Sequence, residues 1–574
     1  MVFARMLPAA WLASLYAACL LVLLILLLNP GLAIRPATVV SFIPLVLLLS
    51  LPTAVGWPAG YRFVRLFARR RLRVRWFSFK YLLGFACANL LLVSSLYWYN
   101  VNLLQALVPE AQALTLRISS GLVSLVSLGF LAIGLVKRWR SLMGVRMTCY
   151  LVAGMLPLGL GLMGGGYSQA TPPAYTPQLV APSADAPRLL LLGIEGATLD
   201  QVLPLVAQGK LPWFGKLLQK GVHGRLASFR PGVSVVAWES LFTGKLPSRH
   251  GVLDDTRYEL PFGAGEIRVA PRGFLFRCFA SRAGMSSAPQ QPSESTALTL
   301  VQILDRLGYP ARILRGGERG EGSSWHRAKV GLDRLLDPEI PTPPDTRELK
   351  NVLLRALEED EAAATAALEA WREGRVRAVF LQLPGLDRVS HRFLRYAMPA
   401  SFGDVPPEEQ EKYGTVLERY YRFLDDWLGK FLGPEFREGQ ASGDSPLVLV
   451  VSPHGIEPLA LVPRLLLRLA GDRFESGQHD RAPDGMIVAA GPGVAHGRPL
   501  GKASILDVTP TLLYSLRLPI GMDMDGHPLA RLFDDAFIAE RPVLLIPSYE
   551  GSRIAGRETA ASGFPLTGAD TMVR

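Results

Sequence analysis

The chain has 574 residues, a hydrophobic content of 49% and a net charge of +12 at pH 7. This length exceeds that of one ordinary domain, and a basic net charge at first suggests a nucleic-acid partner. The distribution of charge argues against such a partner. Residues 1–186 contain 15 Lys and Arg but only two acids, a net charge of +13, whereas the rest of the chain, with 46 basic and 47 acidic residues, carries −1. We therefore expect no nucleic-acid binding.

Uncharged apolar runs dominate the chain before residue 165, and each is close to the ~20 residues that cross a bilayer. Buried core helices are also apolar, but successive runs with charges confined to the gaps favour a region of five transmembrane helices over residues 1–165. The lack of charged residues inside the runs argues against a transporter. The runs are Ala10–Leu28, Thr38–Trp57, Tyr81–Trp98, Ile118–Val136 and Thr148–Met163.

Basic residues between these runs indicate the membrane topology. The loop Tyr61–Lys80 holds seven Arg and one Lys without an acid, and Lys137–Arg146 holds four more basic residues. The intervening loops hold only Arg35 or Arg117. Because basic loops stay in the cytoplasm, the pattern predicts a multi-pass protein of the cell (inner) membrane. Its N-terminus is then cytoplasmic, and the remainder of the chain is extracytoplasmic, in the periplasm.

The second part of the chain alternates between strand and helix patterns. Residues 166–187 are rich in Gly, Pro, Ser and Ala and predict a linker. From residue 188 to 535 the alternation predicts an α/β domain with a mostly parallel sheet, and residues 536–574 form a C-terminal tail. The composition of Arg282–Thr296 predicts a mobile insertion. The main expected elements are strands at Leu189–Ile194, Val376–Leu383, Leu447–Val451 and Gly485–Val494, and one long helix at Pro407–Gly433.

Polar residues follow these strands, and the carboxyl ends of parallel strands are where α/β domains bind ligands. Glu195, Asp387 and His454 follow the first three strands. His391 comes four residues after Asp387, a spacing that places both on one face of a helix. His479 lies in the loop before the fourth strand. Carboxylates and imidazoles together suit zinc or manganese, as one ion or two.

Ser234 is a candidate nucleophile. Apolar residues after Ser234 predict a helix that begins right after this residue and ends at Gly244. Backbone N–H groups at a helix N-terminus favour an anion. A plain N-cap serine is nevertheless the commoner role for a serine before a helix, so both interpretations stay open on this evidence.

A set of ordered motifs resembles the type I phosphodiesterase/nucleotide pyrophosphatase family of the alkaline phosphatase superfamily. The segments "GLDRVSHRF", "SPHG", "SGQH" and Ser504–Gly526 follow in the order of the later motifs of that family. Several motifs in the right order are a more specific signal than one alone. The opening motif matches "IEGA" and then Pro231, Ser234, Trp238, Ser240, Thr243, Gly244, Pro247, His250 and Gly251.

The resemblance implies an alkaline phosphatase-like fold with two metal sites. In the family pattern, one metal is held by the residues that match Asp387, His391 and His479. The other is held by those that match Glu195, Ser234, Pro453 and His454. The residue at Ser234 attacks phosphorus and forms a covalent intermediate, which water or another hydroxyl resolves. Trp238 is expected to be a core residue and His250 a structural one.

Three positions depart from the family pattern. Ser234 replaces a commoner Thr and remains a competent nucleophile, and Glu195 replaces an Asp but keeps a carboxylate. Pro453 replaces an Asp and offers no side-chain ligand. The departure at Pro453 predicts weaker binding of the second metal.

These features together predict a membrane-anchored, metal-dependent phosphodiesterase or phosphotransferase that acts outside the cytoplasm. Its expected substrate is a nucleotide, lipid or envelope-glycan phosphoester, and the lipid bilayer is its expected partner. The layout of membrane helices before an exported domain also resembles phosphoethanolamine and phosphoglycerol transferases. The alternative, supported by Pro453, is a catalytically impaired protein that acts as a membrane-bound scaffold.

Overall fold

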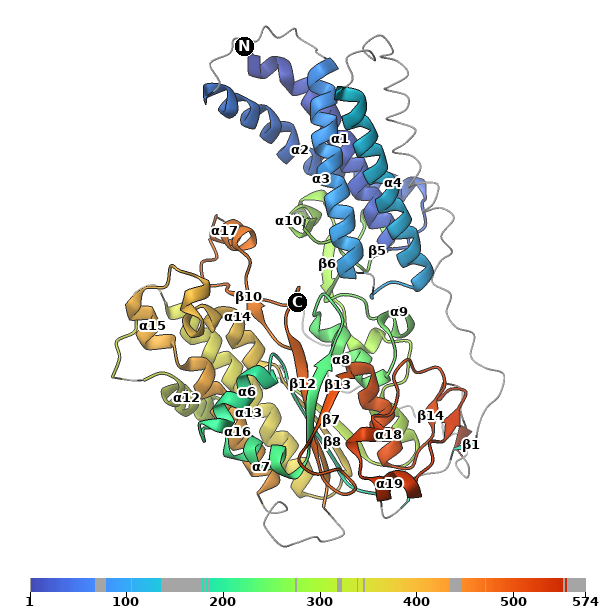
Figure 1. Cartoon of the computed structure of the whole chain (residues 1–574), viewed down its shortest axis with the longest axis vertical. Coiled ribbons are helices and arrows are strands. Elements are labelled where there is room, and N and C mark those ends of the chain that lie inside the picture. Colours follow the sequence, from blue (N-terminus) through green and yellow to red (C-terminus); the bar gives the residue numbers. More distant parts are fainter. Residues whose placement is uncertain are drawn as a thin grey trace, which may run out of the picture.

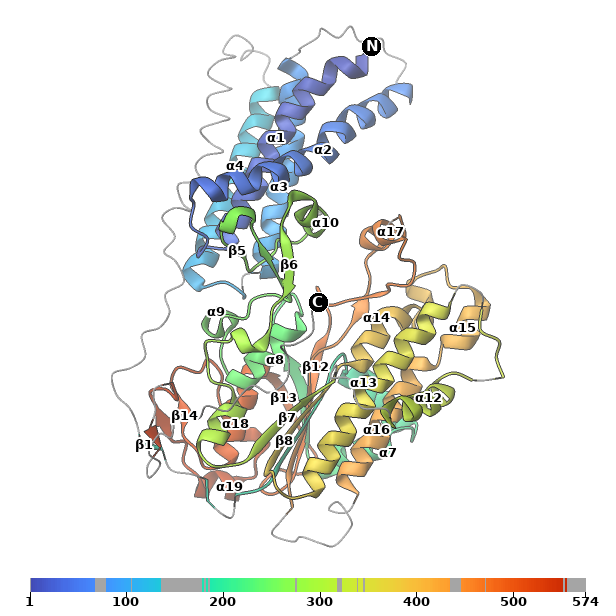
Figure 2. The ribbon, with the colours of Figure 1, turned by 180° about the vertical axis from the view of Figure 1, so that it is seen from behind.

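The protein consists of a helical bundle followed by an α/β domain (Figures 1 and 2). The computed structural model describes residues 2–135 apart from 68–78 and 105, and residues 178–554 apart from short gaps. The gaps in the second range are 180–181, 184–185, 274–275, 317–322, 338, 344–345, 434–444, 470 and 551–552.

Long helices form over four of the five apolar runs. They are α1 (Val2–Leu28), α2 (Pro36–Phe67), α3 (Phe79–Leu104) and α4 (Glu110–Leu135), and they pack side by side (Figure 1). The fifth predicted run, Thr148–Met163, lies outside the described residues. Among the described helices, two contain a segment long and apolar enough to cross a membrane, Ala10–Leu28 and Pro36–Gly60. These two segments correspond to the first two of the five predicted spans, and the other three spans stay predictions.

A seven-stranded sheet forms the centre of the α/β domain. Strand β12 runs antiparallel to both of its neighbours, β3 and β9, whereas the other four pairings are parallel. The sheet is therefore mixed, where the sequence predicted a mostly parallel one. In spatial order the strands are β13 (Arg498–Ser504), β3 (Val222–Ala227), β12 (Asp484–Ala490), β9 (Leu447–His454), β2 (Leu189–Ile194), β8 (Ala378–Leu383) and β7 (Ala311–Arg315).

Helices cover both faces of this sheet, which explains why its central strands are continuously apolar. In β2, Leu190 and Leu192 pack into the core on one face, and Leu189 and Leu191 pack into the core on the other. The first face is covered by α6 (Leu199–Ala207), α7 (Pro212–Lys220), α12 (Ser323–Leu335), α13 (Arg347–Arg372), α14 (Gly385–Ala397) and α16 (Val416–Leu432). The second face is covered by α8 (Ser234–Thr243), α11 (Leu300–Arg306) and α18 (Val508–Ser515).

The predicted single helix Pro407–Gly433 is two helices in the structure. α15 (Pro407–Tyr413) ends before Gly414, and α16 starts at Val416. The N-cap Thr415 of α16 has φ −98° and ψ 0°, which is not helical geometry. The hydrophobic pattern continues across this break, so periodicity alone did not reveal it.

A small sheet connects the bundle to the main domain. It consists of β5 (Glu266–Ile267), β4 (Thr256–Glu259) and β6 (Ser286–Pro289) in that order, with α10 (Phe276–Ala280) beside it. Within Arg282–Thr296, which the sequence predicted to be a mobile insertion, residues Ser286–Pro289 form β6 and pair along the whole of β4. Apolar residues of β4 and β5 share one core with α1 to α4, so tertiary packing stabilises these short strands.

Two asparagines of the bundle bind backbone groups of this connecting region. Asn29 is buried; its Oδ1 accepts from the backbone N–H of Arg268 and Val269 at 2.8 and 2.9 Å, and its Nδ2 donates to Val269 O at 2.9 Å. Asn100 accepts from Arg272 N at 2.7 Å and donates to Arg272 O at 2.9 Å. These bonds fasten the ends of α1 and α3 to the α/β domain.

Segments at the two ends of the α/β domain also pack against it. β14 (Ile520–Gly521) pairs with β15 (Leu545–Ile546), and β1 (Gln178–Leu179) pairs with β16 (Arg553–Ile554). α19 (Asp535–Glu540) contributes Phe537 to the core of the second face. The described part of the predicted tail is therefore integrated into the domain.

Candidate metal-binding site

The topology of the sheet brings four predicted site segments to one edge. β2, β8 and β9 run parallel, so Glu195 after β2, the start of α14 after β8, and His454 at the end of β9 lie together. Because β12 runs the opposite way, its first residue, Asp484, pairs with His454. The loop that enters β12, with His479, therefore reaches the same edge.

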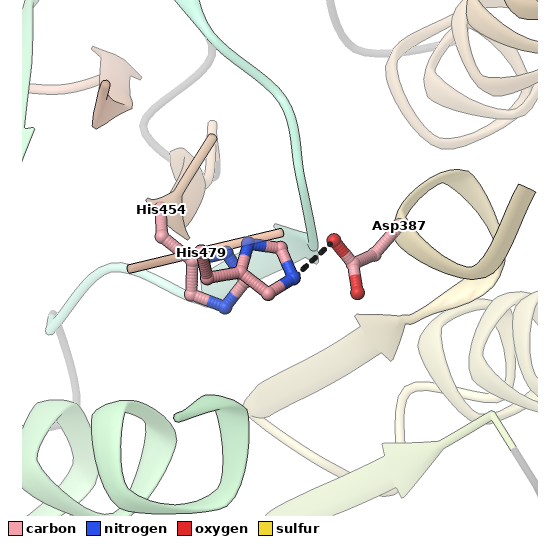
Figure 3. A group of neighbouring side chains, drawn as sticks. All are labelled: Asp387, His454 and His479. Atoms are coloured by element: carbon pink, nitrogen blue, oxygen red, sulfur yellow. Dashed lines mark ion pairs between the residues drawn. The ribbon is translucent and has the colours of Figure 1, made fainter. Parts of the chain in front are cut away.

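Three of these side chains form a compact group (Figure 3). One ligand atom from each of Asp387, His454 and His479 lies within 4.8 Å of the others. Nε2 of His479 is 3.2 Å from Oδ1 of Asp387, and the rings of His454 and His479 have centroids 4.4 Å apart. His391 adjoins the group, because its Nε2 lies 2.9 Å from Nε2 of His479 and 3.6 Å from Oδ2 of Asp387.

Glu195 and Ser234 lie beside this group. Ser234 is the first residue of α8, and its hydroxyl lies close enough to the carboxylate of Glu195 to offset part of the rise that burial causes in the pKa of Glu195. The loop before Ser234 approaches the histidines closely at Gly232, where an added Cβ would lie 3.0 Å from Cβ of His479 and 3.6 Å from Cγ of His454. The structure thus brings all six predicted residues together, while their individual roles stay predictions.

Several polar atoms of the site are buried without a hydrogen-bond partner. They are Oγ of Ser234, Oδ1 of Asp387 and Nε2 of His454. Oδ1 of Asp387 faces His479 as an ion pair but makes no well-directed hydrogen bond. Leaving such groups unpaired costs roughly 1–3 kcal/mol each. Unpaired carboxylate, imidazole and hydroxyl donors at one point fit a divalent cation, which prefers these ligand types.

The protonation of the site also suits a cation. Burial and the charge of Asp387 raise the pKa of Glu195 to about 7. Burial opposes ionisation of Asp387 too, but His479, His391 and His454 lower its pKa to about 2. Burial lowers the pKa of His454 to about 4, which keeps this imidazole neutral and able to donate a lone pair. Two neighbouring carboxylates are costly as a pair of anions, and a bound cation relieves that repulsion.

The structure adds two residues whose roles the sequence did not reveal. Glu475 binds Nδ1 of His391 through its Oε1 at 2.6 Å, and such a carboxylate fixes the ring of a metal-binding histidine. Its position four residues before His479 is the only sequence signal. Trp238, interpreted as a core residue, does pack in the core with 5% exposure, but its Nε1 also donates to Oε1 of Glu195 at 2.5 Å.

Pro453 supplies no side-chain ligand, and Glu457 does not replace it. The proline lies in β9 beyond Val451, the last residue of that strand that pairs with β2, so its missing N–H breaks no bond on that side. Glu457 is the next carboxylate along the chain. Its Oε1 accepts from Nε2 of Gln478 at 3.1 Å and from N of Arg481 at 2.6 Å, so it is engaged elsewhere.

Comparison with protein families finds a match at the start of the α/β domain. Residues 189–264 match the family of type I phosphodiesterases/nucleotide pyrophosphatases. The match covers the start of the α/β domain, so this segment is similar to that family, in agreement with the resemblance of the sequence motifs. The segment of this alkaline phosphatase-like domain that matches the family contains Glu195 and Ser234. Asp387, His391, His454 and His479 lie beyond it.

Comparisons with solved structures and with curated sequences do not extend this similarity. A crystal structure of wild-type alkaline phosphatase PafA is 11% identical to this chain, with a TM-score of 0.43 over 63% of this chain and 100% of that one. No curated protein sequence matches the chain. Within the alkaline phosphatase-like domain, the compact group of Asp387, His454 and His479 combines residues from both predicted metal sites. The division into two sites therefore stays a prediction.

Proposed function

We propose that the protein is a membrane-anchored, metal-dependent phosphodiesterase or phosphotransferase with Ser234 as its nucleophile. The similarity of residues 189–264 to the family supports the reaction class, which is phosphoester hydrolysis or transfer. One observation supports the site above all others. The buried hydroxyl of Ser234 lies beside Glu195, and neither this hydroxyl nor Oδ1 of Asp387 nor Nε2 of His454 makes a well-directed hydrogen bond.

The residues have distinct roles in this proposal. Asp387, His391 and His479 would hold one divalent ion, and Glu195, Ser234 and His454 would bind a second ion with lower affinity. When bound, such ions lower the pKa of the hydroxyl and stabilise charge on the attacking and leaving oxygens. Glu475 keeps the ring of His391 in position, and Trp238 does the same for the carboxylate of Glu195.

The reaction proceeds by two displacements at phosphorus. The hydroxyl of Ser234 gives up its proton to water, and Oγ forms a bond to phosphorus while the bond from phosphorus to the leaving oxygen breaks; the departing alkoxide takes a proton back from water. Water or a second alcohol then attacks phosphorus, the Ser234–phosphorus bond breaks, and the serine recovers its proton. Backbone N–H groups at the start of α8 favour the charged phosphoryl group.

The membrane part of the proposal follows the sequence prediction. Residues 1–165 form a five-helix anchor with a cytoplasmic N-terminus, 166–187 a linker, 188–535 the periplasmic enzyme domain and 536–574 its C-terminal extension. The two apolar segments Ala10–Leu28 and Pro36–Gly60 support an anchor in the inner membrane. A lipid or envelope-glycan phosphoester is then within reach, as is a nucleotide.

Hydrolysis of p-nitrophenyl phosphate esters tests the chemistry. The full-length chain in detergent, with added Zn²⁺ or Mn²⁺, should release p-nitrophenol from a diester or a monoester. Ser234→Ala should lower kcat by roughly 10³-fold or more, because a missing nucleophile leaves only binding and electrostatic catalysis. The matched control is Ser293→Ala, which removes an exposed hydroxyl and should change nothing.

Trapping the intermediate tests the nucleophile directly. Acid quenching during turnover should leave phosphate on Ser234, detectable by mass spectrometry of the digested protein. If the wild type shows no turnover with any metal and equals Ser234→Ala, the scaffold alternative is favoured instead. Phosphate trapped on another residue would reject Ser234 but keep the reaction class.

A further inference from the structure

Helix α17 (Leu461–Leu469) exposes its apolar side chains to the outside of the protein. No residue of this helix is buried. Five apolar side chains of this short helix are much more exposed than leucines in a protein core. Their exposed fractions are 58% for Leu461, 65% for Val462, 48% for Leu465, 49% for Leu466 and 86% for Leu469. A contiguous apolar surface of this kind marks a site of protein or membrane contact.

The charged side chains of α17 face the protein instead. Arg464 donates to Phe402 O at 3.4 Å, and its guanidinium lies 5.3 Å from the centre of the Phe402 ring. Arg468 forms an ion pair with Asp404. The polarity of the helix is therefore inverted relative to a surface helix in water, which buries its apolar face. This arrangement holds the leucines outward.

The position of α17 indicates which surroundings cover the leucines. In both views α17 projects from the α/β domain on the side of the bundle, at about the level of α10 (Figures 1 and 2). α10 in turn contacts α2, one of the two helices apolar enough to cross a membrane. A bilayer crossed by α1 and α2 therefore has a surface close to this level.

Helix α17 is also connected to the candidate site. It is inserted between β10 (Glu457–Pro458) and β11 (Gly477–Gln478), which pair with each other directly before His479. The next residue, Asp480, accepts a hydrogen bond from the hydroxyl of Tyr99 in α3 at 3.1 Å. The segment that carries His479 thus touches the bundle on one side and leads to α17 on the other.

We propose that α17 lies in the interfacial layer of the bilayer that anchors the chain, and that the candidate site acts on a phosphoester whose apolar part is embedded there. The apolar face is purely aliphatic, without the Trp, Tyr or Arg anchors typical of protein interfaces. Interfacial helices bury such faces about 5–10 Å deep at the headgroup boundary. This inference rests on the proposed membrane anchoring and phosphoester chemistry, and it specifies a membrane lipid as the substrate class.

Spin-label accessibility tests the position of α17. The full chain, with its native cysteines replaced, carries one nitroxide at Leu466→Cys or, as the control, at Leu203→Cys, which is 40% exposed on α6. In proteoliposomes of phosphatidylethanolamine and phosphatidylglycerol, the label at 466 should be accessible to oxygen and shielded from a water-soluble nickel complex. The label at 203 should show the reverse. Water accessibility at 466, or spin–spin coupling between two copies, would overturn the proposal.

A matched pair of substrates tests the lipid specificity. Hexadecyl p-nitrophenyl phosphate in vesicles and ethyl p-nitrophenyl phosphate in solution share a leaving group and differ in the apolar chain. The double variant Leu465→Gln/Leu466→Gln should lose about tenfold in kcat/KM on the hexadecyl ester, because both side chains leave the membrane, and nothing on the ethyl ester. Equal effects on both esters contradict the inference.

The two experiments separate this inference from the proposed function. If the wild type hydrolyses neither ester, the proposed function fails, while the accessibility of residue 466 still reports where α17 lies. If the wild type hydrolyses the ethyl ester but the label at 466 faces water, only the membrane role of α17 fails.

Discussion

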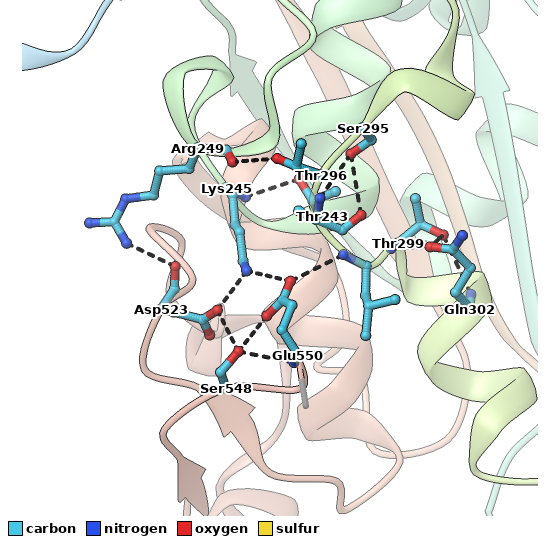
Figure 4. Close-up of polar contacts among 12 residues, drawn as sticks. Thr243, Lys245, Arg249, Ser295, Thr296, Thr299, Gln302, Asp523, Ser548 and Glu550 are labelled. Atoms are coloured by element: carbon cyan, nitrogen blue, oxygen red, sulfur yellow. Dashed lines mark hydrogen bonds and ion pairs between the residues drawn. The ribbon is translucent and has the colours of Figure 1, made fainter. Parts of the chain in front are cut away.

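Two groups of buried charged side chains in the α/β domain differ in where their cation comes from. In the group of Lys245, Asp523, Ser548 and Glu550, Nζ of Lys245 donates to Asp523 at 2.6 Å and to Glu550 at 2.7 Å (Figure 4). At the candidate site, the ion pairs of the described residues join Asp387 only to histidines and give Glu195 no basic partner. The first group contains its own cation, whereas the second leaves that charge to be supplied from outside. This difference separates a structural charge group from a ligand-binding one.

The largest expected effect comes from Asp387→Asn, which removes one charge but keeps the shape of the side chain. We expect kcat/KM to fall roughly 10³-fold, because the cation loses a ligand that touches it. The stability of the metal-free protein should change little, since the lost repulsion from Glu195 offsets part of the lost attraction to the histidines that lowers the pKa of Asp387. p-Nitrophenyl ester hydrolysis, bound metal and thermal unfolding in a chelator measure the three quantities. A large loss of metal-free stability would instead make Asp387 a structural residue.

The opposite result is expected at Lys245, whose side chain is only 8% exposed. Lys245→Met leaves Asp523 and Glu550 without their cation. Breaking a buried ion pair from one side costs 3–5 kcal/mol, and these carboxylates are 28% and 24% exposed, so we expect about 3 kcal/mol at most. Denaturant unfolding of the full chain measures this loss. Metal content should not change, and a variant with full stability but lost metal would reverse the comparison.

The central strands of the α/β domain were largely predictable from the sequence, because apolar runs bounded by turns mark buried strands. β2 matches its predicted range, and β8 and β9 differ by a few residues. The direction of β12 was not predictable. A run such as that from Gly485 has the same composition whether the strand is parallel or antiparallel to its neighbours. The direction of β12 depends on the path of the long connection from β9 through α17 and β11. That direction nevertheless determines whether His479 reaches the site.

The candidate site was predictable in its ligands but not in its supports. Glu195, Asp387 and His454 were found because they follow apolar strands, and that rule needs no tertiary information. Glu475 and the hydrogen bond of Trp238 depend on distances between segments far apart in the chain. The small sheet with β6 was missed for the same reason, since its core is shared with helices more than 100 residues earlier.

Glu475, which binds a predicted metal ligand but not the metal itself, should have an intermediate effect on metal binding. Glu475→Gln keeps the side-chain shape but removes the negative charge beside Nδ1 of His391. We expect metal affinity to fall by roughly tenfold to a hundredfold, as is typical when a histidine ligand loses its carboxylate partner. Competition with a fluorescent zinc chelator measures this change. The matched control is Glu457→Gln, a carboxylate that binds Gln478 and Arg481, and equal losses in both variants would remove the special role of Glu475.

The smallest effect concerns His250, which lies near Lys245 and is internally paired. Nε2 of His250 bonds Oγ of Ser240 at 2.7 Å, and Nδ1 accepts from Val252 N at 3.2 Å. Burial and, to a lesser degree, the charge of Lys245 lower its pKa to about 3. An unfolded histidine has a pKa near 6.5, so between pH 7 and pH 5.5 only the unfolded chain gains this proton. The folded state should therefore lose about 1 kcal/mol over that interval, and stability is fully present only above the unfolded pKa.

His250→Gln isolates this contribution from the other titrating groups. Denaturant unfolding at pH 7 and pH 5.5 should show a smaller pH dependence for this variant than for the wild type, by about 1 kcal/mol. His527→Gln changes an exposed histidine and should retain the wild-type dependence. If His250→Gln shows the same pH dependence of stability as the wild type, His250 is protonated in the folded protein over this interval. The hydrogen bonds to Ser240 and Val252 would then not keep this histidine neutral.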